Sequence, residues 1–336
     1  MTRFTPRLRH LRIVVQAMFL AAFVAAMWAL GSTLVDGALA SGLLALDPLT
    51  AVGTALADGT IPTWTWIGLV VLVATAFLGR VFCGWVCPLG SLQQLVSWIA
   101  GPQRRKRPKL NRYRRWFALK YLVLVVGLVV AVFGLELIGW IDPIPLLHRG
   151  VAMGVRPLWH GGQMTAGWVS FALVAAILLL SAWMPRFFCR SVCPLGAMLG
   201  VVARVAPFRI RRSGTDCDGC SLCLMACQGA DEPLGDHRVS ECHVCLNCID
   251  VCREQGLRYG LDTGSEALST PALDVGRRRA LIAVASAAVV APIVRAAGGG
   301  GPARGHDAIR PPGALDEDAF LARCITCGAC SASCPT

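Results

Sequence analysis

One sequence pattern occurs twice in the chain, as RVFCGWVCPLG at 80–90 and as RFFCRSVCPLG at 186–196. Each copy places two cysteines four positions apart and follows the second with Pro-Leu-Gly. A shorter echo precedes each copy, as LDPL at 46–49 and IDPI at 141–144. Proteins built from two pseudo-symmetric halves usually form their site where the halves meet. The sequence therefore predicts a duplicated unit with a shared site between its halves.

Apolar segments surround both copies of the motif. The chain is 55% hydrophobic and only 15% charged, whereas soluble domains are about 25% charged. This composition argues against a purely soluble enzyme. A membrane-spanning helix needs about 20 apolar residues, and four segments qualify. They are 11–34, 64–82, 117–140 and 167–184. We therefore expect an α-helical membrane domain at 1–205, made of two two-helix hairpins.

The loops between these segments carry an uneven charge. The segment 104–115 is rich in Arg and Lys and has no acidic residue, whereas 35–63 has neither Lys nor Arg. The positive-inside rule places 104–115, both ends of the four-helix unit and both cysteine motifs on the cytoplasmic side. The net charge of +12 follows largely from such loops, so it calls for no nucleic-acid partner. Lys120 lies near the inner end of its segment, where we expect it to extend to the membrane surface.

Two further cysteine runs follow, each with the spacing Cys-x2-Cys-x2-Cys-x3-Cys. They are Cys217, Cys220, Cys223, Cys227 and Cys242, Cys245, Cys248, Cys252. This spacing is the signature of bacterial ferredoxins, in which the fourth cysteine of each run binds the other cluster. Structural zinc sites use cysteine pairs instead. The sequence thus predicts a small α+β cytoplasmic ferredoxin domain at 206–262 with two [4Fe-4S] clusters. The ligand sets are Cys217, Cys220, Cys223, Cys252 for cluster 1 and Cys242, Cys245, Cys248, Cys227 for cluster 2.

The C-terminal part of the chain reads differently. After a linker at 263–279 that ends in three arginines, 280–297 forms a short apolar segment. This combination is typical of a twin-arginine signal or anchor, and a plain fifth spanning helix is the alternative. Either one places the tail after 297 in the periplasm. A third ferredoxin-type run occurs at 298–336 with Cys324, Cys327, Cys330 and Cys334. It lacks partner cysteines, so we expect an incomplete module and a chain that is part of a longer one.

The role of the repeated cysteine motifs stays open at this level. Cys83, Cys87, Cys189 and Cys193 together offer four thiolates at the inner membrane face. They are suited to one more iron-sulfur cluster. They are equally suited to a redox dithiol system or to transient metal binding.

The paired motifs, the four apolar segments and the double ferredoxin run together resemble the NapH-type membrane polyferredoxins, and MauN and the membrane half of the nitrous-oxide-reductase regulator are similar. The resemblance covers residues 1 to about 260. The tail, with Arg277, Arg278 and Arg279 and the third cysteine run, resembles the start of a NapG-type ferredoxin. The resemblance implies [4Fe-4S] clusters, oxidation of quinol from the membrane pool of a bacterial cytoplasmic membrane, and electron delivery to a periplasmic reductase through other ferredoxin or cytochrome subunits.

Quinol oxidation needs proton acceptors near the membrane boundary, and ionisable groups in membrane segments are functional candidates. Glu136, Asp47, Asp142 and His148 are the candidates for this role. Asp-Pro is also a common device for starting a helix or turn, and His148 is equally suited to capping a loop. A competing hypothesis is a polyferredoxin for metal reduction in oxidase assembly or for redox regulation, in which the thiols of the paired motifs handle metal or sense redox state.

Overall fold

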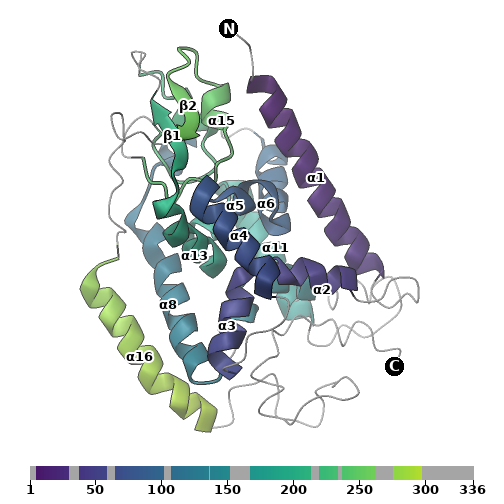
Figure 1. Cartoon of the computed structure of the whole chain (residues 1–336), viewed down its shortest axis with the longest axis vertical. Helices are drawn as coiled ribbons and strands as arrows, with labels where there is room; N and C mark the ends of the chain where they lie inside the picture. Colours follow the sequence, from purple (N-terminus) through teal and green to yellow (C-terminus); the bar gives the residue numbers. More distant parts are fainter. Residues whose placement is uncertain are drawn as a thin grey trace.

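The structure is a computed structural model in which most of the described residues are helical (Figure 1). It describes residues 5–29, 38–58, 65–101, 107–135, 137–151, 167–212, 219–233, 237–261 and 275–296.

The duplicated motif lies in matching positions of two helical halves. The first half contains α1 (Thr5–Ala29), α2 (Ala38–Ala45), α3 (Pro48–Asp58), α4 (Thr65–Leu78), α5 (Val81–Trp85) and α6 (Pro88–Ile99). The second contains α7 (Arg107–Asn111), η1 (Arg115–Ala118), α8 (Leu119–Val132), η2 (Ile138–Trp140), α9 (Pro143–Arg149), α11 (Gly167–Trp183), α12 (Phe187–Ser191), α13 (Pro194–Val202) and η4 (Ala203–Val205). In each half an Asp-Pro helix, a long apolar helix and two short helices follow one another.

The two halves pack crosswise. Helix α6, which follows the first cysteine motif, packs on α11 of the second half, and α13, which follows the second motif, packs on α4 of the first. One continuous hydrophobic core joins the halves and includes Leu49, Leu89, Leu147 and Leu195. The two motifs therefore lie where the halves meet, as the internal repeat predicts.

A small β-containing unit caps one end of the helical body (Figure 1). Strands β1 (Phe208–Arg212) and β2 (Leu257–Leu261) pair antiparallel, with Phe208 opposite Leu261. Between them lie α14 (Leu222–Ala226) and α15 (Asn247–Asp250), each beginning inside one cysteine run. The sequence thus forms the predicted α+β unit. The last described element, α16 (Arg277–Ala296), packs alongside α8.

Two stretches of helix in the described residues are long and apolar enough to cross a membrane, Arg9–Met27 and Lys109–Val132. The other two expected spans contain shorter apolar helices, Thr65–Leu78 and Trp168–Trp183. The third expected span runs to 140, but α8 ends at Val132 because Gly134 turns the chain with φ of +76°, a conformation that glycine adopts without steric cost.

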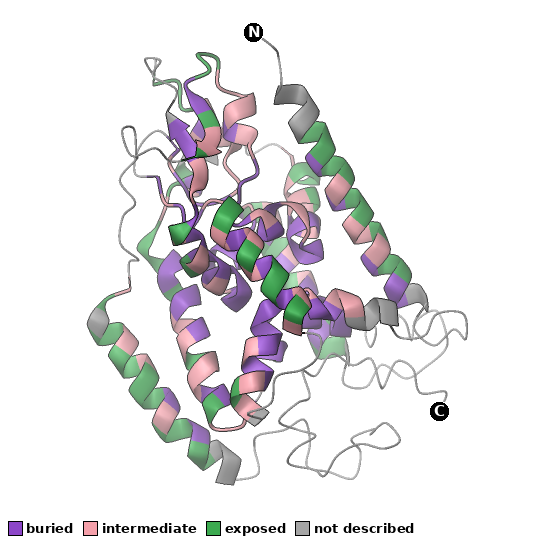
Figure 2. Ribbon diagram, in the orientation of Figure 1, coloured by how far each residue is buried: buried purple, intermediate pink, exposed green. Residues whose placement is uncertain are grey.

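Many residues on the outer faces of the helices are exposed (Figure 2), and many of the exposed residues are large and apolar. Leu179 on α11 is 73% exposed and Leu281 on α16 is 69% exposed. A soluble monomer rarely exposes contiguous apolar patches of more than a few hundred Å². The polar interior shows the opposite pattern, since charged side chains such as Arg80 and Lys120 are fully buried.

The close approach of the two units at Gly84 yields a first prediction. A Cβ added to Gly84 in α5 would lie 2.2 Å from the carbonyl oxygen of His243, which is far inside van der Waals contact. We expect Gly84→Ala to lower the free energy of unfolding by about 1–3 kcal/mol, the usual cost of overpacking. Thermal unfolding in detergent measures this. Gly42→Ala is the control, because nothing lies within 4 Å of its added Cβ.

Candidate metal centre

The two cysteine motifs form equivalent turns with matching backbone hydrogen bonds. In the first, the N–H groups of Val86 and Cys87 both donate to the carbonyl of Phe82, at 3.0 Å each. In the second, Val192 and Cys193 both donate to Phe188, again at 3.0 Å. In each copy the first cysteine lies inside a one-turn helix, and the second precedes the helix that starts at the motif's proline.

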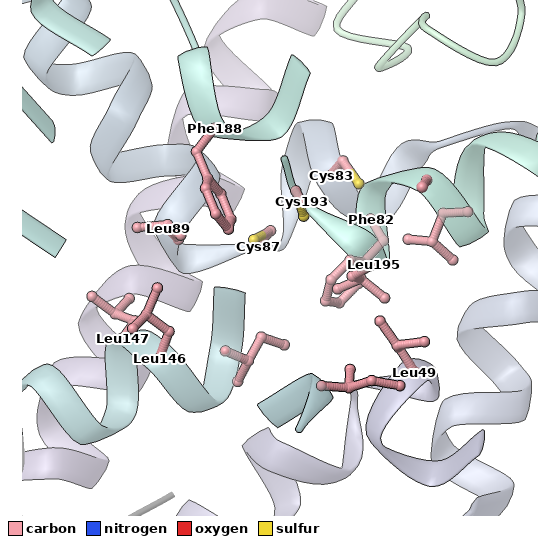
Figure 3. Packing of buried hydrophobic residues seen from close by; sticks show 14 of the residues in the cluster. Leu49, Phe82, Cys83, Cys87, Leu89, Leu146, Leu147, Phe188, Cys193 and Leu195 are labelled. Atoms are coloured by element: carbon pink, nitrogen blue, oxygen red, sulfur yellow. The ribbon is translucent and has the colours of Figure 1, made fainter. Parts of the chain in front are cut away.

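This fold brings the four motif cysteines together in the core. Cys83, Cys87, Cys189 and Cys193 are at most 7% exposed. Figure 3 shows the sulfur atoms of Cys83, Cys87 and Cys193 gathered among buried apolar side chains. Cys189 of the second motif is bonded to the first half, because its sulfur accepts a hydrogen bond from Nε2 of Gln93 on α6 at 3.3 Å. The structure therefore makes one four-thiol group from two distant segments.

The local environment of these thiols is suited to metal-bound thiolates. Burial, followed by the neighbouring Cys189, raises the pKa of the Cys87 and Cys193 thiols well above the ordinary value. A buried thiolate therefore needs compensation, and a metal supplies it because metal ligands are deprotonated. The protein itself supplies part of this compensation, since the N–H of Gly196 donates to Sγ of Cys193 at 3.2 Å. Hydrogen bonds to sulfur are among the features that set iron-sulfur potentials.

Buried cations around the thiols indicate what kind of group fits. Arg80 and Arg186 are 0% and 1% exposed, and Nε of each has no hydrogen-bond partner. A cubane iron-sulfur cluster takes one thiolate at each of its four corner irons and carries a net negative charge. Four buried thiols beside two buried arginines are therefore suited to hold a [4Fe-4S] cluster.

The ferredoxin unit holds the other described cysteines. Cys223, Cys245 and Cys248 are buried, Cys227, Cys242 and Cys252 are partly buried, and Cys220 is exposed. Cys223 of the first run and Cys248 of the second belong to one buried cluster, and Cys242 packs against it. Cys227 also lies near the second run, because its charge acts on Cys242 and Cys248. The described cysteines of the two runs thus lie close together.

The loop that carries the second run is bound directly to the first cysteine motif. Arg80 donates to the carbonyl of Ser240 at 2.6 Å, and Trp85 donates to that of Val244 at 3.0 Å. From α1, Arg12 donates to the carbonyl of Cys245 at 2.6 Å. Backbone carbonyls on both sides of Cys242 are therefore held by side chains of the helical domain.

The second motif contacts the ferredoxin unit as well. The buried guanidinium of Arg190 donates to the carbonyl of Gln228 at 2.9 Å and to Oδ1 of Asn111 at 3.0 Å. Asn111 in turn donates to the carbonyl of Leu224 at 3.0 Å. Both motifs therefore contact segments next to ferredoxin cysteines.

Lys120 does not extend to the membrane surface as expected. It is fully buried and forms an ion pair with Glu241, the residue before Cys242. The hydroxyl of Tyr121 donates to the other carboxylate oxygen at 3.0 Å. The expectation is wrong because the ferredoxin unit covers this end of α8 and supplies a partner that the local sequence does not reveal.

The candidate proton-site residues fall into different places. Asp47 and Asp142 are fully buried at the starts of α3 and α9, and their side chains interact. Asp142 also lies near enough to Cys193 to raise the pKa of that thiol. His148 is fully buried on α9. Glu136 lies outside the described residues, as do Cys217 and the run Cys324, Cys327, Cys330 and Cys334.

Burial raises the pKa of Asp47 to about 6, which gives a testable pH dependence. The folded protein binds this proton more tightly than the unfolded chain, whose Asp has a pKa of about 4. Stability should therefore fall as the pH rises from about 4 to about 6, by up to about 1.4 kcal/mol per pH unit, and stay low above that. Asp47→Asn should flatten this profile and raise the unfolding midpoint at neutral pH. An unchanged pH profile would contradict the argument.

Comparison with known proteins also indicates an iron-sulfur protein. A family profile described as "4Fe-4S binding domain" matches residues 60–108 and 166–213. Each of these two ranges contains one of the two cysteine motifs. The fold and the site therefore define a ferredoxin-type iron-sulfur protein with a duplicated 4Fe-4S binding domain.

Individual proteins with similar sequences narrow the assignment to a family. The chain is 31% identical to the methylamine utilization ferredoxin-type protein MauN of Methylorubrum extorquens, over 65% of this chain and 73% of MauN. It is 29% identical to the ferredoxin-type protein NapH of Haemophilus influenzae, over 76% of this chain and 88% of NapH. The putative electron transport protein YccM of Escherichia coli is 29% identical over 63% of this chain, which spans 60% of YccM. No solved structure matches.

The chain belongs to the NapH and MauN family of ferredoxin-type proteins. The resemblance to NapH-type proteins and MauN is thereby confirmed.

Proposed function

We propose that this protein relays electrons from membrane quinol, through [4Fe-4S] clusters, to a respiratory reductase in the periplasm. One observation carries the proposal. The buried four-thiol group of the paired motifs lies directly against the loop of Cys242 and Cys245, joined through Arg80 and Trp85. Side-chain hydrogen bonds join the two units, so redox centres held in them would lie close together. Such an arrangement is suited to passing electrons from one centre to the other.

The membrane location is part of the proposal. It comprises four spanning helices in two hairpins, with the ferredoxin unit 206–262 in the cytoplasm and the tail after 297 in the periplasm. The two long apolar helices support it, as do the exposed apolar residues of α4, α11 and α16. Helices α4 and α11 are short for a full crossing, so their spans would include the adjoining residues.

The cysteines have assigned roles in this account. The four thiols of the paired motifs hold a third cluster. In the ferredoxin unit, Cys217, Cys220, Cys223 and Cys252 hold cluster 1, and Cys242, Cys245, Cys248 and Cys227 hold cluster 2. When bound, such clusters supply one-electron transfer. The protein residues keep the thiolates dry and neutralise their charge.

Quinol oxidation also releases two protons. Two aspartates between the two helical halves are candidate acceptors for them. Asp47 and Asp142 interact at the interface between the halves, and Asp142 lies near Cys193. A carboxyl with a pKa of about 6 is suited to accepting and releasing a proton near neutral pH. We assign these two aspartates to proton uptake, with His148 as the onward acceptor.

The test uses the full chain purified anaerobically in detergent. Iron and acid-labile sulfide are measured, and a reduced quinol analogue is then added while EPR follows the clusters. The proposal expects quinol to reduce at least one centre. If dithionite reduces the clusters but quinol reduces none, the quinol assignment is wrong and the iron-sulfur one stands. Oxidation of the reduced clusters by Cu(II) would then favour the alternative, metal reduction in oxidase assembly.

A further inference from the structure

Arg80 and Arg186 occupy equivalent places in the two cysteine motifs. Each is the first residue of its motif, three positions before the first cysteine, and each is fully buried. Burying a guanidinium is costly unless an anion or a complete set of acceptors compensates it. The partners of these two residues therefore indicate what the site is built to hold.

Each of the two arginines reaches into the other motif. Nη1 of Arg186 donates to the carbonyl of Cys83 at 2.8 Å, and its Nη2 donates to Oε1 of Gln94 at 3.0 Å. Nη2 of Arg80 lies 3.9 Å from Sγ of Cys83, and it would lie 2.9 Å from a Cβ added to Gly196. Arg80 thus lies beside the sulfur of Cys83, and Arg186 lies beside the backbone carbonyl of the same residue, where the two motifs meet.

Gly196 of the second motif leaves the space that Arg80 of the first motif occupies. A Cβ on Gly196 would lie 2.9 Å from Arg80, closer than real contacts allow, and 3.4 Å from Sγ of Cys193. The equivalent Gly90 faces Arg186, with Nη1 at 3.8 Å from its added Cβ. A side chain at Gly196 would therefore collide with Arg80, whereas an added Cβ at Gly90 would be in ordinary contact with Arg186.

Protein acceptors leave these cations incompletely compensated. Within the described ranges, neither arginine has a carboxylate within ion-pair distance, and Nε of each lacks a hydrogen-bond partner. The nearby Glu241 is already paired with Lys120. Arg190 differs at one atom, because its Nε does donate, to the carbonyl of Gln228 at 3.1 Å. Four thiolates around an iron-sulfur core would place a negative charge beside Arg80 and Arg186.

We propose that Arg80 and Arg186 are the counter-cations of a cluster held by the four motif cysteines and that together they raise its reduction potential. The inference rests on the proposed function. Adding an electron makes the cluster more negative, so adjacent buried cations stabilise the reduced form more than the oxidised one. A raised potential is what a first acceptor of quinol electrons requires, because quinols are weaker reductants than ferredoxins.

The test replaces each arginine in the full chain by glutamine, which removes the charge, and by lysine, which keeps it. Mediated redox titrations followed by EPR give the midpoint of each centre, and iron and sulfide are measured alongside. We expect each Gln variant to shift the midpoint of one centre negatively, by at least tenfold in the reduction equilibrium, or about 59 mV for one electron. The Lys variants keep the charge, so their midpoint potentials should stay close to that of the unmodified protein. Arg112→Gln is the control, because Arg112 is exposed and paired with Glu232.

Each outcome decides the matter. An unchanged midpoint in iron-replete Gln variants overturns the proposal. Loss of iron in the Gln variants with retention in the Lys variants supports it, since charge then holds the cluster. Equal loss of iron in Gln and Lys variants overturns it, because the shape of the guanidinium would then be the requirement. These titrations need no quinol, so a failure of the quinol assignment is seen separately, as absence of quinol reduction in the unmodified protein.

Discussion

Replacing Lys120 by methionine is expected to lower the free energy of unfolding by about 3–5 kcal/mol, the usual cost of breaking a buried ion pair from one side. Glu241 is only 2% exposed and would keep its charge without its cation. Because Glu241 precedes Cys242, the same change should loosen the ferredoxin unit against α8. Denaturant unfolding in detergent, followed by the visible absorbance of the clusters, measures the loss.

Two further variants separate charge from packing. The double variant Lys120→Met, Glu241→Gln removes both charges and should recover most of the stability, because no unpaired buried charge remains. Arg112→Met breaks an exposed pair at the same interface and should have no measurable effect. If Lys120→Met alone is as stable as the unmodified protein, the pair does not hold the two units together.

Replacing Cys193 by serine is expected to remove about one third of the bound iron and sulfide, since one of three [4Fe-4S] clusters would lose a ligand. The two ferredoxin clusters should stay, because Cys193 lies in the helical domain and contributes to neither run. Iron analysis with EPR of the dithionite-reduced protein measures this.

Ser181→Ala is the matched control, since it removes a buried hydroxyl that donates to Gln93 on the opposite half but takes no thiol away. It should leave the iron content unchanged. If Cys193→Ser also keeps all its iron, the paired motifs hold no cluster and serve as thiols instead, which is the alternative that the sequence leaves open.

The arrangement of these sites is only partly predictable from the sequence. The repeat at 80–90 and 186–196 predicted a shared site between halves, because similar local sequences form similar turns, and both motifs have matching backbone hydrogen bonds. The cysteine spacing likewise predicted a two-run ferredoxin unit. Such features are local, so neighbouring residues determine them.

Long-range pairings escaped prediction for the opposite reason. Lys120 and Glu241 are 121 residues apart, and nothing near either one indicates the other. Arg80 and Arg186 look like membrane-flanking charges until the fold shows them buried. Their place at the start of both motifs was the one available signal. Part of the basic segment 104–115 also binds the ferredoxin unit, through Arg112 and Glu232.

One measurement tests the central claim most directly, that electrons enter through the paired motifs. Reduced quinol analogue is added anaerobically to the unmodified protein and to Cys193→Ser, and freeze-quenched EPR follows the ferredoxin clusters. The account predicts that quinol reduces them in the unmodified protein and fails to do so in Cys193→Ser, although dithionite reduces them in both. Equal reduction by quinol in both proteins would contradict it.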